Sequence, residues 1–210
     1  MLGFYRRHWF DIGGVLAVVV GVVLLLKWKT LPYIQLLMAL NFFTLLLHQF
    51  EEYRWPGGLP GQMNGGLHKS DMPDRYPANP HSLMLLNTVG AYPFYLLPVF
   101  FPDVIWLGLG PVLLAFAQVP THGLMMPIKL KTLYGKGFIT AFFMWLPIGI
   151  LYIRHIVAEG LVRPADWVYG AIYMFLFGAF VVQGTIRIFR DKHTPHRFAR
   201  KQLGRWGNAS

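Results

Sequence analysis

Residues 31–53 read LPYIQLLMALNFFTLLLHQFEEY, an apolar run that ends in three ionisable side chains. A transmembrane helix needs about 20 apolar residues to cross a hydrocarbon layer of roughly 30 Å. Leu31–Phe50 supplies this length, and Pro32 falls in the first turn, where a missing N–H costs no hydrogen bond. The stretch therefore predicts a membrane-spanning helix.

Five other apolar segments flank this one, and together they predict an all-α bundle of about six transmembrane helices. They are Ile12–Leu26, Leu83–Phe101, Val104–Met126, Phe138–Val157 and Trp167–Ile188. Only 13% of the 210 residues are charged, about half the share that is usual in soluble domains. We therefore expect a single transmembrane domain over residues 1–190, with no separate soluble domain. Pro111 and Pro120 predict a bend or break in the fourth helix.

The basic residues predict how the bundle lies in the membrane. With six crossings, 15 of the 19 Lys and Arg residues fall on the side that carries both chain ends. The other side receives Lys27, Lys29, Arg154 and Arg163. Because loops rich in Lys and Arg stay in the cytoplasm during insertion, we expect both termini to be cytoplasmic and the chain to span the inner, cytoplasmic membrane of the cell several times.

Two segments outside the predicted helices have a composition that differs from that of the helices. Residues 53–81 are rich in Gly and Pro and predict an irregular loop, which is either a lid over a binding site, with Trp55 as part of the cover, or a plain connector. Residues 191–210 form a basic tail, interpreted as a flexible strand that binds anionic lipid headgroups. The placement of the net charge of +10 is explained by membrane topology, so membrane lipids are the expected partners and no nucleic acid is expected.

One face of the helix within residues 31–53 is polar. At 100° per residue, five polar side chains of its second half share an arc of about 100°. They are Asn41, Thr44, His48, Glu51 and Glu52. Ionisable groups at membrane depth are costly and therefore candidates for function. His48 and Glu52 are one turn apart and can bind one metal ion, while Glu51 remains as a second ligand, a general base or a support behind the ligands.

Polar residues of the other helices are predicted at the same depth. Asn87 lies near the start of the third helix, Gln118 and His122 near the end of the fourth, and Gln183 and Arg187 near the end of the sixth. All of these positions fall in the cytoplasmic third of the predicted bundle. We therefore expect a polar pocket that opens to the cytoplasm, with His122 either as a third metal ligand or as a hydrogen-bonded histidine without a metal. Arg187 is interpreted as interfacial.

The polar stripe also contains a pattern that resembles a known family. His48-Gln49-Phe50-Glu51-Glu52 has the form H-x-x-E-E and resembles the signature of the HXXEE family of small prokaryotic integral membrane proteins. The resemblance continues in a second block, with a histidine, a Y-x-P-G-like turn and a helix with a late proline. Its residues are His122, Tyr134-Gly135-Lys136-Gly137, Thr140 and Leu146-Pro147.

Lys136 occupies the position where the family usually has proline, and Asn87 resembles a polar position of the family's middle helix. The resemblance covers roughly residues 35 to 150. It implies a helical membrane fold and a site near the motif. It implies no reaction, because the biochemical function of the family is not established.

The pattern favours a membrane-embedded, metal-dependent, hydrolase-like enzyme that acts on a lipidic or membrane-associated substrate. His48, Glu52 and His122 would bind a divalent metal ion, with Zn²⁺ favoured. Glu51 would transfer a proton, and Asn87 would orient a substrate carbonyl. The absence of cysteine excludes thiolate ligands.

Two non-enzymatic alternatives remain open. A small ion-coupled transporter would use the same carboxylates as a proton or cation site. In a non-catalytic membrane subunit, the buried polar groups would serve helix packing alone.

Overall fold

The computed structural model of the protein describes residues 1–208 and is all-helical over this part of the chain. It contains six helical spans that are long and apolar enough to cross a membrane. Their bounds are Leu2–Lys27, Tyr33–Tyr53, Pro80–Phe100, Ile105–Leu130, Phe138–Ala158 and Pro164–Phe189. The predicted all-α bundle of six helices is thereby confirmed, and the protein has the architecture of a multi-pass membrane protein.

The first two spans, α1 (Leu2–Lys27) and α2 (Tyr33–Tyr53), are continuous helices, whereas each of the other four contains a π-helical turn. The third span joins α4 (Pro80–Met84), η2 (Leu85–Gly90) and α5 (Ala91–Phe100). The fourth joins α6 (Ile105–Pro120), η3 (Thr121–Met125) and α7 (Met126–Leu130). The fifth joins α8 (Phe138–Thr140), η4 (Ala141–Trp145) and α9 (Leu146–Ala158). The sixth joins α10 (Pro164–Leu176), η5 (Phe177–Gly184) and α11 (Thr185–Phe189).

Two details differ from the sequence prediction. The first helix begins at Leu2, ten residues before Ile12, because its polar first turns continue the helix although they lie outside the apolar run. There Trp9 packs against Tyr53, with ring centroids 4.8 Å apart. The fourth helix runs through Pro111 without a break, and its irregular turn follows Pro120 instead.

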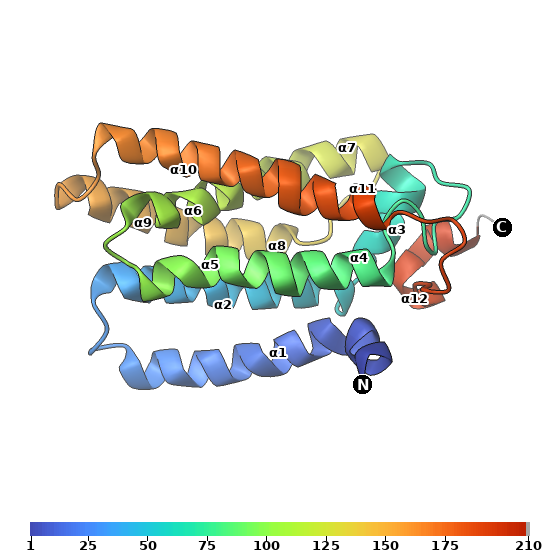
Figure 1. Ribbon diagram of the computed structural model, residues 1–210, viewed down its shortest axis with the longest axis horizontal. Coiled ribbons are helices and arrows are strands. Elements are labelled where there is room, and N and C mark those ends of the chain that lie inside the picture. Colours follow the sequence, from blue (N-terminus) through green and yellow to red (C-terminus); the bar gives the residue numbers. More distant parts are fainter. Residues whose placement is uncertain (209–210) are drawn as a thin grey trace.

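Small residues allow the helices to approach one another closely. On α1, Gly14 faces the ring of Phe50 on α2, where a Cβ atom would lie 2.8 Å from the ring. Between α6 and α10, Gly170 is likewise in contact with Leu109. Such close packing is typical of membrane helices, which gain little from the hydrophobic effect. Figure 1 shows α1 along one side of the bundle and α10 along the opposite side.

The segment after α2 is folded over one end of the bundle. It contains α3 (Leu59–Gly61) and η1 (Gln62–Leu67) and leads into α4, where Asn79 and Ser82 form a capping box. Asn64 fixes it by donating from Nδ2 to the backbone carbonyls of Pro73 and Ala78. We call residues 54–79 the covering segment.

The C-terminal segment packs on the covering segment, at the end of the bundle that also carries the N-terminus (Figure 1). It forms α12 (Arg200–Leu203) and η6 (Gly204–Asn208). Leu203 is buried over Gly61, Trp206 lies over Gly65, and Arg205 donates to the carbonyl of Leu130. The tail is therefore folded, unlike the flexible strand that we expected. Its last two residues lie outside the described part of the chain.

Candidate metal centre

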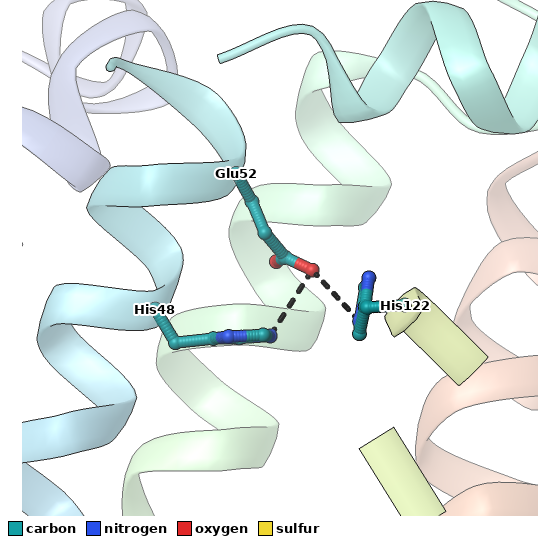
Figure 2. Close-up of side chains that lie close together, drawn as sticks. All are labelled: His48, Glu52 and His122. Carbon is teal, nitrogen blue, oxygen red and sulfur yellow. Dashed lines mark ion pairs between the residues drawn. The ribbon is translucent and has the colours of Figure 1, made fainter. Parts of the chain in front are cut away.

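Three ionisable side chains from two helical spans meet inside the bundle. His48 and Glu52 come from the last turns of α2, and His122 comes from η3, the π-helical turn after Pro120. Each offers a ligand atom within 4.8 Å of the other two. Figure 2 shows the Glu52 carboxylate between the two imidazoles. Its Oε1 lies 3.2 Å from Nε2 of His48 and 3.5 Å from Nε2 of His122.

The cluster is almost completely closed to solvent. The exposed fractions of His48, Glu52 and His122 are 2%, 6% and 4%. A carboxylate at such a site is costly unless a positive charge neutralises it. The charge is neutralised either by a proton, on the carboxylate itself or on one imidazole, or by a metal ion between the three groups. Two histidines and one carboxylate form a donor set that Zn²⁺ uses in enzymes, so the residues fit such an ion.

The hydrogen bonds behind His48 decide which of its nitrogen atoms faces Glu52. Nδ1 of His48 lies 2.8 Å from Oγ1 of Thr140, and that hydroxyl lies 2.6 Å from Oε2 of Glu51. A threonine hydroxyl has one hydrogen, which the Glu51 carboxylate accepts at the shorter distance. The hydroxyl must therefore accept a hydrogen from Nδ1. In the neutral imidazole, this network places the Nε2 lone pair toward Glu52.

This lone pair has no partner of its own in the protein. Nε2 of His48 is buried and makes no hydrogen bond, and its approach to Glu52 does not have hydrogen-bond geometry. A lone pair that faces a carboxylate is repelled unless a cation lies between them. The orientation of His48 is thus the one that a metal ligand needs, with its other nitrogen fixed by a hydrogen bond.

Glu51 points away from the cluster and is held by four donors. The Thr140 hydroxyl and the Thr140 backbone N–H, at 2.9 Å, donate to Oε2. The Ile139 backbone N–H, at 3.0 Å, and the Tyr134 hydroxyl donate to Oε1. The two carboxylates of the motif therefore have different surroundings. Glu52 faces the imidazoles, and Glu51 fixes the start of the fifth span.

The turn before α8 packs its backbone directly against the cluster. Gly137 has φ of +98°, and a Cβ atom there would lie 2.5 Å from Cε1 of His48 and 3.2 Å from Cγ of Glu52. Gly135 meets the backbone of His122 in the same way, so that a Cβ atom would overlap its carbonyl oxygen. Only glycine fits at both positions, because any side chain would displace a member of the cluster.

Lys136 forms part of this turn although the resemblance expects proline at its position. Its backbone N–H donates to Oε1 of Gln62 at 3.1 Å, a bond that proline could not make. The amide of Gln62 also donates to the Tyr134 carbonyl at 3.2 Å, so the covering segment holds the turn at two points. The turn is therefore stable with lysine in place of proline.

Two titratable groups of the turn have shifted pKa values. Burial raises the pKa of Tyr134 above its ordinary range, and the hydrogen bond to Glu51 raises it further. Burial lowers the pKa of the Lys136 amine, while the negative charge of Glu51 opposes this shift. The Tyr134 phenol therefore remains protonated and continues to donate to Glu51.

The cluster lies on the wall of a cavity of about 410 Å³ between the helices. Most lining side chains are apolar, among them Leu45, Leu86, Leu114, Trp145 and Phe177. Leu59, Met63 and Leu67 of the covering segment close part of it. Trp55 does not take part, because its side chain is 74% exposed and lies outside the lining.

The cavity brings together most of the polar residues that the sequence placed at this depth. Asn87, Gln118 and Gln183 line it together with His48, Glu52 and His122, whereas Arg187 is exposed and does not. Asn87 is already bonded on both sides of its amide. Its Oδ1 accepts from Gln49 at 3.2 Å, and its Nδ2 donates to the Leu83 carbonyl and the Tyr53 hydroxyl.

The sequence did not assign roles to Thr140, Tyr134 or Gly137, although all three belong to the block that resembled the family. Their contacts with α2 cross more than 80 positions of sequence, and helix periodicity carries no information about such contacts. The one usable signal was the Tyr-Gly-Lys-Gly turn followed by a threonine.

Comparison with known proteins identifies the family of the chain. Residues 39–152 match the family described as "Protein of unknown function with HXXEE motif". The match spans more than half of the 210 residues, and the chain belongs to this family. No curated protein and no solved structure matches the chain. The matched range contains the candidate metal ligands, both glycines of the turn and the network around Glu51.

Proposed function

We propose that this member of the HXXEE family is a membrane-embedded, metal-dependent hydrolase. It binds a divalent cation, preferably Zn²⁺, through His48, Glu52 and His122. The observation that carries the proposal is the buried Nε2 atom of His48, which has no hydrogen bond and faces the Glu52 carboxylate. Three protein ligands and a free fourth position are typical of catalytic zinc sites, whereas structural sites use four protein ligands.

A bound ion of this class would supply Lewis acidity, which polarises a carbonyl group and makes water more acidic. The protein's own residues hold the site. Thr140 and Glu51 fix the ring of His48, and Gly137 presses the turn against it. We expected Glu51 to transfer a proton. Its four donors favour a positioning role instead, in which Glu51 acts on His48 through Thr140.

The cavity supports a lipidic or membrane-associated substrate. Its lining is mainly apolar, and its volume of about 410 Å³ lies in the range of small-molecule sites. Asn87 is the residue proposed to orient a substrate carbonyl, which requires it to exchange its 3.3 Å bond to Tyr53. The covering segment is proposed to act as a lid, because its residues Leu59 and Met63 line the cavity.

The site is proposed to lie near the cytoplasmic face, with both termini in the cytoplasm. Support comes from the 19 Lys and Arg residues, 15 of which lie on the side of the termini in a six-helix topology. The cluster lies at the end of α2 that is nearest to this side.

The function is tested by assaying the purified protein, in lipid nanodiscs, against fluorogenic esters and amides with acyl chains of graded length. We expect hydrolysis that is lost after chelation, restored by Zn²⁺ and abolished in Glu52→Ala. Glu159→Ala is the matched control, because Glu159 is an exposed carboxylate in the loop after α9. Hydrolysis that survives both chelation and Glu52→Ala would refute a metal-dependent reaction at this site.

An ion-coupled carrier is the second function that the cluster supports. Glu52 contacts two imidazoles, which is also a suitable arrangement for a proton relay. Uptake into proteoliposomes that requires Glu52, with every tested lipid left intact, would favour the carrier over the hydrolase. Variants that lower only the yield of folded protein would favour a non-catalytic subunit.

A further inference from the structure

A second cavity lies at the end of the bundle that carries the termini, outside the metal cluster. It has a volume of about 360 Å³ and is formed by the first turns of α1, the residue after α2, the start of α4 and the C-terminal segment. Five cationic side chains line it, namely Arg6, Arg7, Arg54, Arg197 and Lys201. We call it the basic hollow.

The carboxylates near the basic hollow neutralise only part of this charge. Asp11 pairs with Arg54 at 3.0 Å, and Asp74 lies 3.8 Å from Arg197 while it pairs more closely with Arg75, at 2.8 Å. Within residues 1–208, no carboxylate pairs with Arg6, Arg7 or Lys201. The hollow therefore has a positive charge that the described chain does not neutralise.

Arg6 lines the hollow and bonds to two imidazoles outside its lining rather than to an acid. Its Nε donates to Nδ1 of His81 at 3.4 Å, and its Nη1 lies 3.3 Å from Nδ1 of His196. Burial lowers the pKa of His196, and the positive charge of Arg6 lowers it further. A neutral imidazole accepts hydrogen bonds without adding a charge. The two histidines thus orient the guanidinium and leave its charge available.

The walls of the hollow are amphipathic. Trp9, Phe10 and Leu83 contribute apolar surface beside the cations, and Tyr53 and Leu83 also line the cavity of the metal cluster. Guanidinium groups bind phosphate through paired hydrogen bonds, and aromatic side chains are common at the level of lipid headgroups. A ligand with a phosphate group and an adjoining apolar part matches both features.

From the unneutralised cations and the apolar walls, we infer that the basic hollow binds the phosphate group of an anionic lipid headgroup, with Arg6 as the central contact and Arg7 and Lys201 beside it. Cations from three distant parts of the chain converge there, and their mutual repulsion is relieved when an anion is bound. Lipid binding in the basic hollow does not depend on a metal ion at His48, Glu52 and His122 or on hydrolysis.

The test measures the affinity of detergent-purified protein for dioctanoyl phosphatidylglycerol, with dioctanoylglycerol and inorganic phosphate as separate probes. Loss of a hydrogen bond between charged groups predicts that Arg6→Gln weakens phosphatidylglycerol binding about tenfold or more. Lys201→Gln, a change at an exposed position, is expected to weaken it in the same direction. Arg187→Gln removes the same charge from an exposed position outside the hollow and is expected to change the affinity less than twofold.

Three possible results of these binding measurements would contradict the proposed lipid site. Equal losses of phosphatidylglycerol affinity in Arg6→Gln and Arg187→Gln would indicate unspecific attraction between a basic protein and an anionic lipid. That result would contradict a specific site in the basic hollow. Equal affinity for dioctanoylglycerol would exclude recognition of the phosphate. If inorganic phosphate binds as tightly as phosphatidylglycerol, the hollow recognises a soluble phosphate and not a lipid. The zinc content of Arg6→Gln is measured in parallel and should equal that of the wild type. The lipid site and the metal site are thereby tested independently of each other.

Discussion

His48 donates its Nδ1 hydrogen to the hydroxyl of Thr140, 2.8 Å away and 92 positions further along the chain. Because the Thr140 hydroxyl in turn donates to Glu51, the H-x-x-E-E motif acts as one unit with the start of the fifth span. One glutamate of the motif joins the candidate ligands, and the other fixes the tautomer of the histidine.

Thr140→Val tests the hydrogen bonds that join His48 to Glu51 through the Thr140 hydroxyl. Valine has nearly the shape of threonine but can neither accept from His48 nor donate to Glu51. Removing such a partner behind a metal ligand typically reduces metal affinity about 10–100-fold, and we expect a loss of this size in a zinc competition titration. Thr140→Ser keeps the hydroxyl and should retain most of the affinity. Equal affinities in valine and serine variants would contradict the role of the hydroxyl.

Gly137→Ala tests whether the turn must touch the cluster. The alanine Cβ would lie 2.5 Å from the ring of His48, in addition to the strain of φ at +98°. Gly160→Ala is the matched control, since Gly160 has φ of +63° but no heavy atom near the added Cβ. Both variants should lose about 1–2 kcal/mol of stability from the backbone alone. Only Gly137→Ala should also lose zinc affinity, and equal zinc affinity in the two variants would contradict the contact.

Helix periodicity in the sequence places His48 and Glu52 on one face of α2, one turn apart, and the structure brings their side chains to 3.2 Å from each other. The sequence left open how Glu51 differs from Glu52, as a second ligand, a general base or a support behind the ligands, since both lie within the same arc of about 100°. The difference arises from the turn at Tyr134–Gly137, which offers Glu51 its donors. Such a contact depends on tertiary packing, and no local pattern in α2 indicates it.

Tyr134→Phe tests the pH dependence of the network. The pKa of Tyr134 is raised in the folded protein above the value of about 10 in an unfolded chain. Its contribution to stability is therefore complete below about pH 10 and is lost as the pH rises through the higher folded pKa. Wild type should be about 1 kcal/mol more stable than Tyr134→Phe at pH 8, and this advantage should shrink at alkaline pH.

Thermal unfolding followed by tryptophan fluorescence from pH 8 to 11 gives this comparison. Tyr169→Phe serves as the control, because the Tyr169 side chain is 55% exposed. If Tyr134→Phe and the wild type lose stability in parallel over the whole range, the Tyr134 proton does not support Glu51.

Gly61→Ala tests how the C-terminal segment is attached. The added Cβ would overlap the carbonyl of Leu203, so α12 must move away from α3. We expect faster cleavage by trypsin near Arg197 and Lys201, with the transmembrane spans still protected. Gly184→Ala has a similar helical backbone with room for the methyl group, and it should be cleaved like the wild type. Unchanged cleavage of Gly61→Ala would show that the segment is not held at this contact.

The ends of the chain show where sequence patterns are least informative. Hydropathy detects the apolar part of the first helix and therefore misses its polar first turns, which begin at Leu2. The tail looks solvated because it is basic, yet Phe198 and Leu203 are buried against the covering segment. A few apolar residues in a charged stretch are enough to attach it once a complementary surface exists.

Elemental analysis of the detergent-purified wild type, His48→Ala and His122→Ala measures directly whether His48, Glu52 and His122 bind one metal ion. We expect about one zinc ion per chain in the wild type and a loss of that ion in both variants, because each histidine would supply one of only three ligands. A wild-type protein that binds no stoichiometric metal, even after incubation with Zn²⁺, would show that a proton rather than a metal ion neutralises Glu52. Retention of the ion in either variant would show that the two helices do not share it.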